Sequence, residues 1–99
     1  MDKIIKDKIL KKLEMDASYD GGYPGGVIKS FRKRLQQIDS AVDERDFYNL
    51  RSLNFEKLKG NRQHQYSMRI NDQWRLILEF KGSDAGKKIV IIINIEDYH

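Results

Sequence analysis

The chain has 99 residues, of which 39% are hydrophobic and 34% are charged, and its formal net charge is +4. This length predicts one domain, residues 1–99, with a single modest core. The longest apolar run, 89–93, is far shorter than the ~20 residues that span a membrane, and the first residues do not predict a signal peptide. Cysteine is absent, which excludes disulfides, thiolate metal sites and cysteine nucleophiles. We therefore expect a cytoplasmic protein without membrane contact.

The excess of positive charge is concentrated in two segments. Residues 27–38 carry four basic side chains and no acidic one, and residues 57–75 carry five against Asp72 alone. The basic residues are Lys29, Arg32, Lys33 and Arg34 in the first segment and Lys57, Lys59, Arg62, Arg69 and Arg75 in the second. Clustered positive charge attracts polyanions, chiefly nucleic acid. A solvated surface with salt bridges is the alternative interpretation.

The N-terminal half of the chain has the pattern of helices. Its first apolar residues recur at helical spacing and predict a short helix over 7–15, with 2–6 as a possible strand before it. Residues 19–26 are rich in glycine and predict a turn. An apolar stripe flanked by basic residues predicts a second helix over 27–40, and 43–50 could hold a further helical turn.

The C-terminal half alternates apolar and polar residues, which is typical of strands. Residues 66–70 and 74–80 predict a hairpin. A loop with an odd number of residues, the three residues 71–73, is needed to place the large apolar side chains of both strands on one face. It also places Arg69 beside Arg75 on the other face, where two like charges cost energy unless an anion lies between them. This juxtaposition is the first indication of a phosphate site.

A third strand is predicted over 89–96, after a polar loop, and its unbroken apolar character favours a central position in the sheet. Helices come first in the chain and strands follow. This order predicts an α+β fold, with a twisted antiparallel sheet and the N-terminal helices packed on one face.

Two histidines, His64 and His99, are the possible imidazole acids or bases. His64 lies near the start of a strand, where an exposed or hydrogen-bonded structural role is the alternative. His99 follows a buried-type strand together with Asp97 and Tyr98, so a rigid element would present titratable groups to solvent. No metal-ligand spacing is present, because the acidic cluster at 43–46 is explained by a solvated turn. We expect neither a metal nor a cofactor.

Metal-free cleavage of RNA needs groups of the kinds that remain. Lysine and arginine can hold a phosphodiester and neutralise the charge that builds on it. An imidazole or a phenol can move protons at the attacking or leaving oxygen. The 2′-hydroxyl of RNA supplies the nucleophile that DNA lacks, so the pattern favours RNA. The candidate RNA-binding residues are Lys57, Arg62, His64, Arg69 and Asn71. Lys57 and Arg62 could instead only solvate a loop.

Three motifs together resemble the HigB branch of the RelE/ParE toxin superfamily. They are Leu58-Lys59-Gly60, the segment from Tyr66 to Arg75, and the terminal Glu96-Asp97-Tyr98-His99. The resemblance covers most of the chain and is strongest over 55–99. It implies a type II toxin–antitoxin toxin, a small basic ribonuclease that enters the ribosomal A site and cuts mRNA. It also implies a helix-turn-helix antitoxin, HigA-like, through which alone the toxin would reach operator DNA.

The resemblance further implies roles for particular residues. Lys59 and Arg75 match family residues that engage phosphate. Asp97, Tyr98 and His99 match the terminal catalytic group, in which His99 transfers a proton and Tyr98 orients the RNA. In ribosome-dependent relatives a histidine can precede the Leu-Lys-Gly motif by two positions, where this chain has Glu56. This departure leaves one acid–base role open.

Two alternative functions remain at this point. One is a ParE-like toxin that inhibits gyrase by binding. The other is a basic nucleic-acid-binding domain without activity, whose lysine and arginine residues contact phosphates.

Overall fold

The elements follow one another along the chain in a computed structural model that describes residues 1–82 and 86–97. The helical half contains β1 (Lys3–Ile5), α1 (Lys8–Met15), α2 (Gly25–Ser40), α3 (Arg45–Asn49) and the 3₁₀ turn η1 (Arg51–Leu53). The strand-rich half contains β2 (Glu56–Lys57), the 3₁₀ turn η2 (Gly60–Arg62), β3 (Tyr66–Arg69), β4 (Trp74–Gly82) and β5 (Lys88–Asp97). The predicted helices over 7–15 and 27–40, the helical turn within 43–50 and the three strands are all present.

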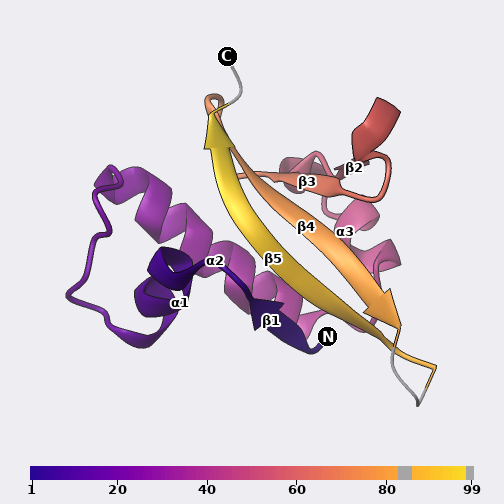
Figure 1. The fold of residues 1–99 in the computed structure, drawn as a ribbon, viewed down its shortest axis with the longest axis horizontal. Helices are drawn as coiled ribbons and strands as arrows, with labels where there is room; N and C mark the ends of the chain where they lie inside the picture. The colour runs from indigo at the N-terminus through magenta and orange to yellow at the C-terminus, as the bar shows by residue number, and fades with distance from the viewer. Residues whose placement is uncertain (83–85, 98–99) are drawn as a thin grey trace.

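The strands form one sheet in the order β1-β5-β4-β3-β2, with the helices on one side (Figure 1). Strands β2 to β5 are antiparallel neighbours, whereas β1 runs parallel to β5 with Ile4 opposite Ile91. The predicted α+β class is therefore confirmed, but the sheet is mixed and not wholly antiparallel. The reason is that β5 is central, as its apolar sequence predicts, and the short N-terminal strand fills its otherwise open edge.

The helices begin where side chains or carbonyls satisfy their first N–H groups. Oδ1 of Asp7 accepts hydrogen bonds from the backbone N–H of Ile9 (2.9 Å) and Leu10 (3.1 Å), so Asp7 is the N-cap of α1. Helix α2 begins at Gly25, two residues before the predicted start, because the carbonyl of Pro24 accepts the N–H of Val27 at 3.0 Å.

Removing the cap of α1 is expected to destabilise the protein. Asp7→Ala leaves two backbone donors of the first turn without their partner, so we expect the free energy of unfolding to fall by about 1 kcal/mol. Urea titration followed by circular dichroism measures it. Lys8→Ala, which changes an exposed neighbouring residue, is the matched control and should leave the urea midpoint unchanged.

The core lies between the helices and the sheet. Phe31 and Ile38 of α2 are fully buried against the sheet residues Leu76, Leu78 and Ile92. The hairpin between β3 and β4 has the predicted parity, with Met68 opposite Leu76 and Arg69 opposite Arg75. The three-residue loop is thus confirmed. It places Met68, Leu76 and Leu78 in this core and leaves Ser67, Arg69, Arg75 and Ile77 on the other face of the sheet.

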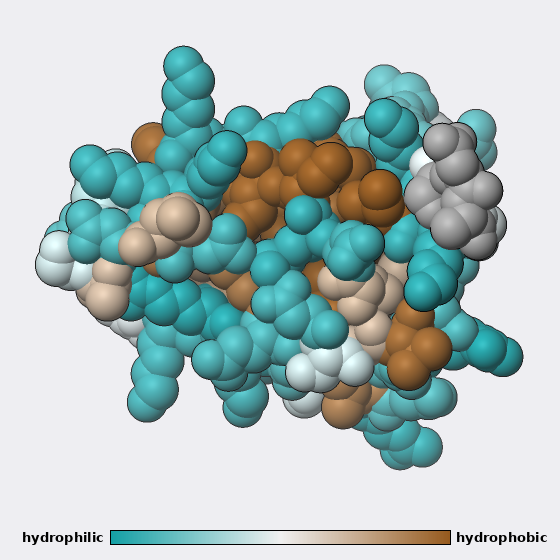
Figure 2. Space-filling model, turned by 90° about the horizontal axis from the view of Figure 1, so that it is seen from below, coloured by the Kyte–Doolittle hydropathy of each residue, from teal (hydrophilic) through white to brown (hydrophobic). Residues whose placement is uncertain are grey.

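The face of the sheet away from the helices is partly apolar. One extra residue of β5, Ile93, lies in the bulge between the pairs Ile77–Asn94 and Leu78–Ile92. Ile4 of β1 is 47% exposed, while Ile77 of β4 is fully buried. Seen from below, the molecule has hydrophilic side chains over most of its surface and one area where apolar side chains gather (Figure 2). Within the described residues, no helix combines the length and apolar character needed to cross a membrane.

Candidate functional site

The loop between β2 and β3, residues 58–65, is tied to the face of the sheet that lies away from the helices. Arg62 donates from Nη2 to Oε2 of Glu96 (2.6 Å) and from Nε to Oε1 of Gln65 (2.9 Å). Gln65 in turn donates from Nε2 to Oε2 of Glu79 at 3.0 Å. Arg62, a candidate RNA-binding residue, therefore has a positioning role here: it fixes the loop that carries the Leu-Lys-Gly motif.

Arg75 is a buried cation held in one position. Its side chain is 6% exposed, and Nη2 donates to the carbonyl of Asn54 (2.6 Å) and to Oγ of Ser67 (2.8 Å). Asn54 has a φ of 43°, a left-handed conformation that non-glycine residues rarely adopt. Oε1 of Glu56 lies 3.7 Å from the same nitrogen. The site therefore combines a fixed guanidinium with a carboxylate.

Arg69 lies directly opposite Arg75 in the register, as predicted, but it turns to another partner. Its Nη2 forms an ion pair with Oδ1 of Asp72 in the hairpin loop, and its side chain is 38% exposed. The repulsion between the two guanidinium groups is thus relieved inside the protein. The register alone does not require a phosphate between Arg69 and Arg75, which corrects the inference from the sequence.

The strand β2 directs its two residues to opposite faces of the sheet. Glu56 pairs with Ser67 and is thus on the face that carries Arg75, whereas Lys57 pairs with Tyr66 and is on the other. Both side chains are exposed. Lys57, a candidate RNA-binding residue, is therefore not brought together with Arg75, and Glu56 is.

The remaining candidates in the motif region are mostly exposed. Lys59 is exposed immediately before η2, the turn that Arg62 fixes. The His64 side chain is 62% exposed, with Nε2 3.7 Å from Oε2 of Glu79. Asn71 is used locally, because its Oδ1 accepts the N–H of Gln73 (2.9 Å) and of Trp74 (2.8 Å) and so shapes the hairpin loop.

The C-terminal group is described only as far as Asp97. Asp97 pairs with Trp74 and its Oδ2 accepts a hydrogen bond from Nε2 of Gln73 at 3.0 Å, while Glu96 lies opposite Arg75. Tyr98 and His99 lie outside the described residues. The end of β5 is therefore next to Arg75 in the sheet, and the acidic residue opposite Arg75 is Glu96, which sequence reasoning did not select.

Arg34 is a further residue that sequence reasoning did not select for the site. It is 6% exposed, and its Nε donates to the carbonyl oxygen of Arg69 at 2.7 Å. Burial lowers the pKa of Arg34, and the positive charge of Arg69 adds to this effect. Arg32 of the same helix is structural, because its guanidinium donates to the carbonyl oxygens of Leu13 (3.1 Å) and Asp16 (3.2 Å). The charge pattern alone does not distinguish these two arginines.

Over residues 1–82 and 86–97, no group of three histidine, aspartate or glutamate side chains is arranged to hold a metal ion. The described part of the site offers the fixed cation of Arg75, the carboxylate of Glu56 3.7 Å from it, and the exposed Lys59 in the loop before η2. Such groups can bind a phosphodiester and exchange protons with it.

The fold is that of the RelE/ParE-like toxins. Two solved structures share the fold: a YoeB/ParE toxin from Agrobacterium tumefaciens (TM-score 0.59, 15% identity, 100% of both chains covered), and a chain of the YoeB–YefM complex from Staphylococcus aureus (TM-score 0.57, 20% identity, 100% of this chain and 97% of that chain covered).

The sequence comparison is more specific. The family described as the RelE-like toxin of the type II toxin–antitoxin system HigB matches residues 3–99. The Endoribonuclease HigB of Proteus vulgaris is 33% identical over 103 residues, which cover 100% of both chains. The chain therefore belongs to the HigB-like toxin family of type II toxin–antitoxin systems.

Proposed function

We propose that the chain is an endoribonuclease that cuts mRNA on the ribosome, using the 2′-hydroxyl of the RNA as nucleophile and no metal ion. The name of the Proteus vulgaris relative supports the ribonuclease activity. The observation that carries the proposal is the arrangement around Arg75, where Oε1 of Glu56 lies 3.7 Å from a guanidinium that Asn54 and Ser67 hold in place.

Each group has a role in the proposed reaction. Glu56 accepts the proton of the 2′-hydroxyl as the 2′-oxygen bonds to phosphorus. Arg75, with Lys59 from the loop, stabilises the negative charge that builds on the phosphoryl oxygens. The bond from phosphorus to the 5′-oxygen then breaks, and His99 donates the proton that the leaving oxygen needs. Tyr98 orients the RNA in this proposal. The products are a 2′,3′-cyclic phosphate and a free 5′-hydroxyl.

We also propose the partners that this function requires. A helix-turn-helix antitoxin, HigA-like, would bind the toxin and connect it to operator DNA, and both would be cytoplasmic. An antitoxin partner is supported by the family itself, since it is defined by a toxin–antitoxin system. A short helix-turn-helix reading frame next to that of the toxin would support the identity of this partner.

The nucleophile can be tested by removing it from the substrate. An mRNA with a 2′-deoxynucleotide at the cleavage position is expected to resist the toxin on the ribosome, because no 2′-oxygen remains to attack phosphorus. Primer extension measures cleavage, and the same substitution two codons away is the control. Cleavage of the modified mRNA, or products that end in a 3′-hydroxyl and a 5′-phosphate, would contradict the mechanism. A DNA-damage response without transcript cleavage would instead select inhibition of gyrase.

A further inference from the structure

Arg34 is a buried charge whose hydrogen-bond partners are neutral. Its Nε donates to the carbonyl of Arg69 (2.7 Å) and its Nη1 to Oε1 of Gln37 (3.0 Å), and no carboxylate of the described residues pairs with it. Neutral acceptors satisfy N–H groups but do not compensate a desolvated charge. Arg69 adds a second positive charge nearby. The arrangement lacks a negative partner, which an approaching anion would supply.

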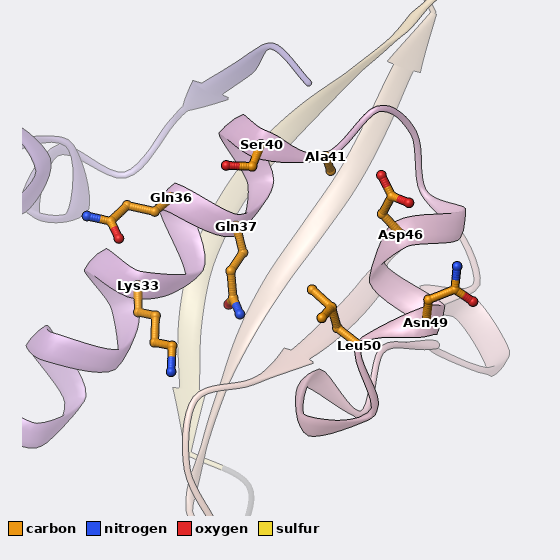
Figure 3. A pocket seen from close by; sticks show the side chains of 8 residues that line it. All are labelled: Lys33, Gln36, Gln37, Ser40, Ala41, Asp46, Asn49 and Leu50. Atoms are coloured by element: carbon orange, nitrogen blue, oxygen red, sulfur yellow. The ribbon is translucent and has the colours of Figure 1, made fainter.

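A groove lies beside this arginine, between α2 and α3 (Figure 3). Its volume is about 540 Å³, and six of the eight residues that line it have polar or charged side chains, although most of the exposed surface of the groove is apolar. Gln37, which binds Arg34, forms part of its wall, as do Lys33, Ser40 and Asn49. In Figure 3, Lys33 and Gln37 extend from α2 in the same direction.

The acid in the lining, Asp46, accepts the N–H of Val42 at 2.8 Å and so has a local role. Lys33 lines the groove, and Arg34 is connected to its wall through the hydrogen bond to Gln37. Their two positive charges exceed the single negative charge of Asp46, which favours an anionic ligand at the α2 side of the groove.

We propose that Arg34 and Lys33 bind a backbone phosphate of the RNA that the toxin cuts, and that the groove between α2 and α3 holds the adjoining nucleotide. This inference rests on the proposed ribonuclease function and assigns a second RNA contact to it. The hydrogen bond from Arg34 to the carbonyl of Arg69 connects the groove to the β3–β4 hairpin, where Arg69 lies opposite Arg75. The groove lies on the helix side of the sheet, so in this proposal the RNA strand held at Arg75 passes around the hairpin to reach it.

The lining favours a nucleotide over other anions. The amides of Gln37 and Asn49 and the hydroxyl of Ser40 are donors and acceptors of the kind that bind base edges and the 2′-hydroxyl. A volume of about 540 Å³ is within the range of small-molecule sites. The groove is thus suited to one nucleotide of the bound RNA and would influence the sequence preference of the toxin.

Two lysines of α2 allow a matched test. Lys33 lines this groove and also a neighbouring one, whereas Lys29, one turn earlier, lines only the neighbouring groove, with Tyr19 and Asp20. Both are exposed, so Lys33→Gln and Lys29→Gln remove the same charge with little effect on the fold. The probe is an RNA octamer with 2′-O-methyl groups, which cannot be cleaved, and its affinity is measured from 50 to 200 mM salt. We expect the slope of log affinity against log salt to fall by about 0.7 for Lys33→Gln and not for Lys29→Gln.

Arg34 is tested in the same assay. Arg34→Gln is expected to weaken octamer binding by about tenfold, because it removes a charge-assisted contact, and Arg34→Lys to restore part of the affinity. Should Arg34→Gln fail to fold by circular dichroism, the pair of lysine variants still decides the question.

The outcomes separate this inference from the function on which it rests. Equal salt slopes for the two lysine variants, or no octamer binding by a protein that does cut mRNA, would contradict the groove proposal alone. Competition by a polyglutamate peptide as strong as that of the RNA would contradict it too, since it would show a general anion site. Absence of mRNA cleavage by the unaltered toxin on ribosomes would instead overturn the proposed function.

Discussion

Arg75→Lys is expected to slow RNA cleavage by about 10²-fold while the protein remains folded. Lysine keeps the positive charge but replaces a planar fork with a flexible ammonium group. It cannot donate to Asn54 and Ser67 with the geometry of the guanidinium and at the same time face the phosphate. The expected loss of cleavage rate therefore results from a change in the position of the positive charge and not from its removal.

Single-turnover cleavage of mRNA on ribosomes measures this effect, and a urea titration measures the fold in parallel. Arg45→Lys is the matched control, because the Arg45 side chain is 84% exposed and its ion pair joins the start of α3 to Asp43, just before the helix. That variant should cleave at the unaltered rate. A rate for Arg75→Lys within threefold of the unaltered toxin would show that Arg75 is only a structural residue.

The backbone register of this site follows from the sequence, but the side-chain contacts do not. The alternation of apolar residues in β3 and β4 requires an odd loop, and this parity alone places Arg69 opposite Arg75. Where each guanidinium goes depends on partners that the register does not specify, namely Asp72 in the hairpin loop for Arg69 and the distant Asn54 for Arg75. Arg75 meets the carbonyl of Asn54, which a left-handed backbone conformation presents, and no sequence pattern indicates that conformation.

The basic segment in α2 shows the same limit. Arg32, Lys33 and Arg34 are consecutive, and the charge pattern treats them alike. In the structure Arg32 donates to carbonyl oxygens in the last turn of α1 and just after it, Lys33 is exposed, and Arg34 is buried against β3. Their roles differ because the three side chains leave α2 in different directions. The packing of the helix on the sheet determines which side chain meets α1, which meets solvent and which meets β3.

The pairing of the two edge strands, β1 and β2, could not be predicted from the sequence either. Residues 2–6 could be recognised as a possible strand, but its direction and partner depend on which edge of the sheet remains open. The faces of β2 follow from its pairing with β3, which separates Glu56 from Lys57. A two-residue strand has too little pattern to predict this. Only the structure therefore shows that the carboxylate of Glu56 lies beside Arg75. The sequence indicates only that position 56 does not hold the histidine of some relatives.

His99→Ala is expected to lower the cleavage rate by about 10²- to 10⁴-fold, because it removes the proposed donor to the leaving 5′-oxygen. Deletion of Tyr98 and His99 should likewise relieve growth arrest. Glu56→Gln keeps the shape of the side chain and removes the carboxylate. It is expected to lower the cleavage rate by a similar factor, because it removes the proposed acceptor of the 2′-hydroxyl proton.

The pH dependence assigns the two roles. A base must be unprotonated and an acid protonated, so the rate of the unaltered toxin should rise and then fall as pH increases. His99→Ala is expected to abolish the fall and Glu56→Gln the rise, measured as single-turnover rates across pH with folding checked by circular dichroism. His64→Ala is the matched control, since that imidazole is 62% exposed and lies near Glu79, and both limbs should survive in it. Loss of the alkaline limb in His64→Ala in place of His99→Ala would move the acid role from His99 to His64.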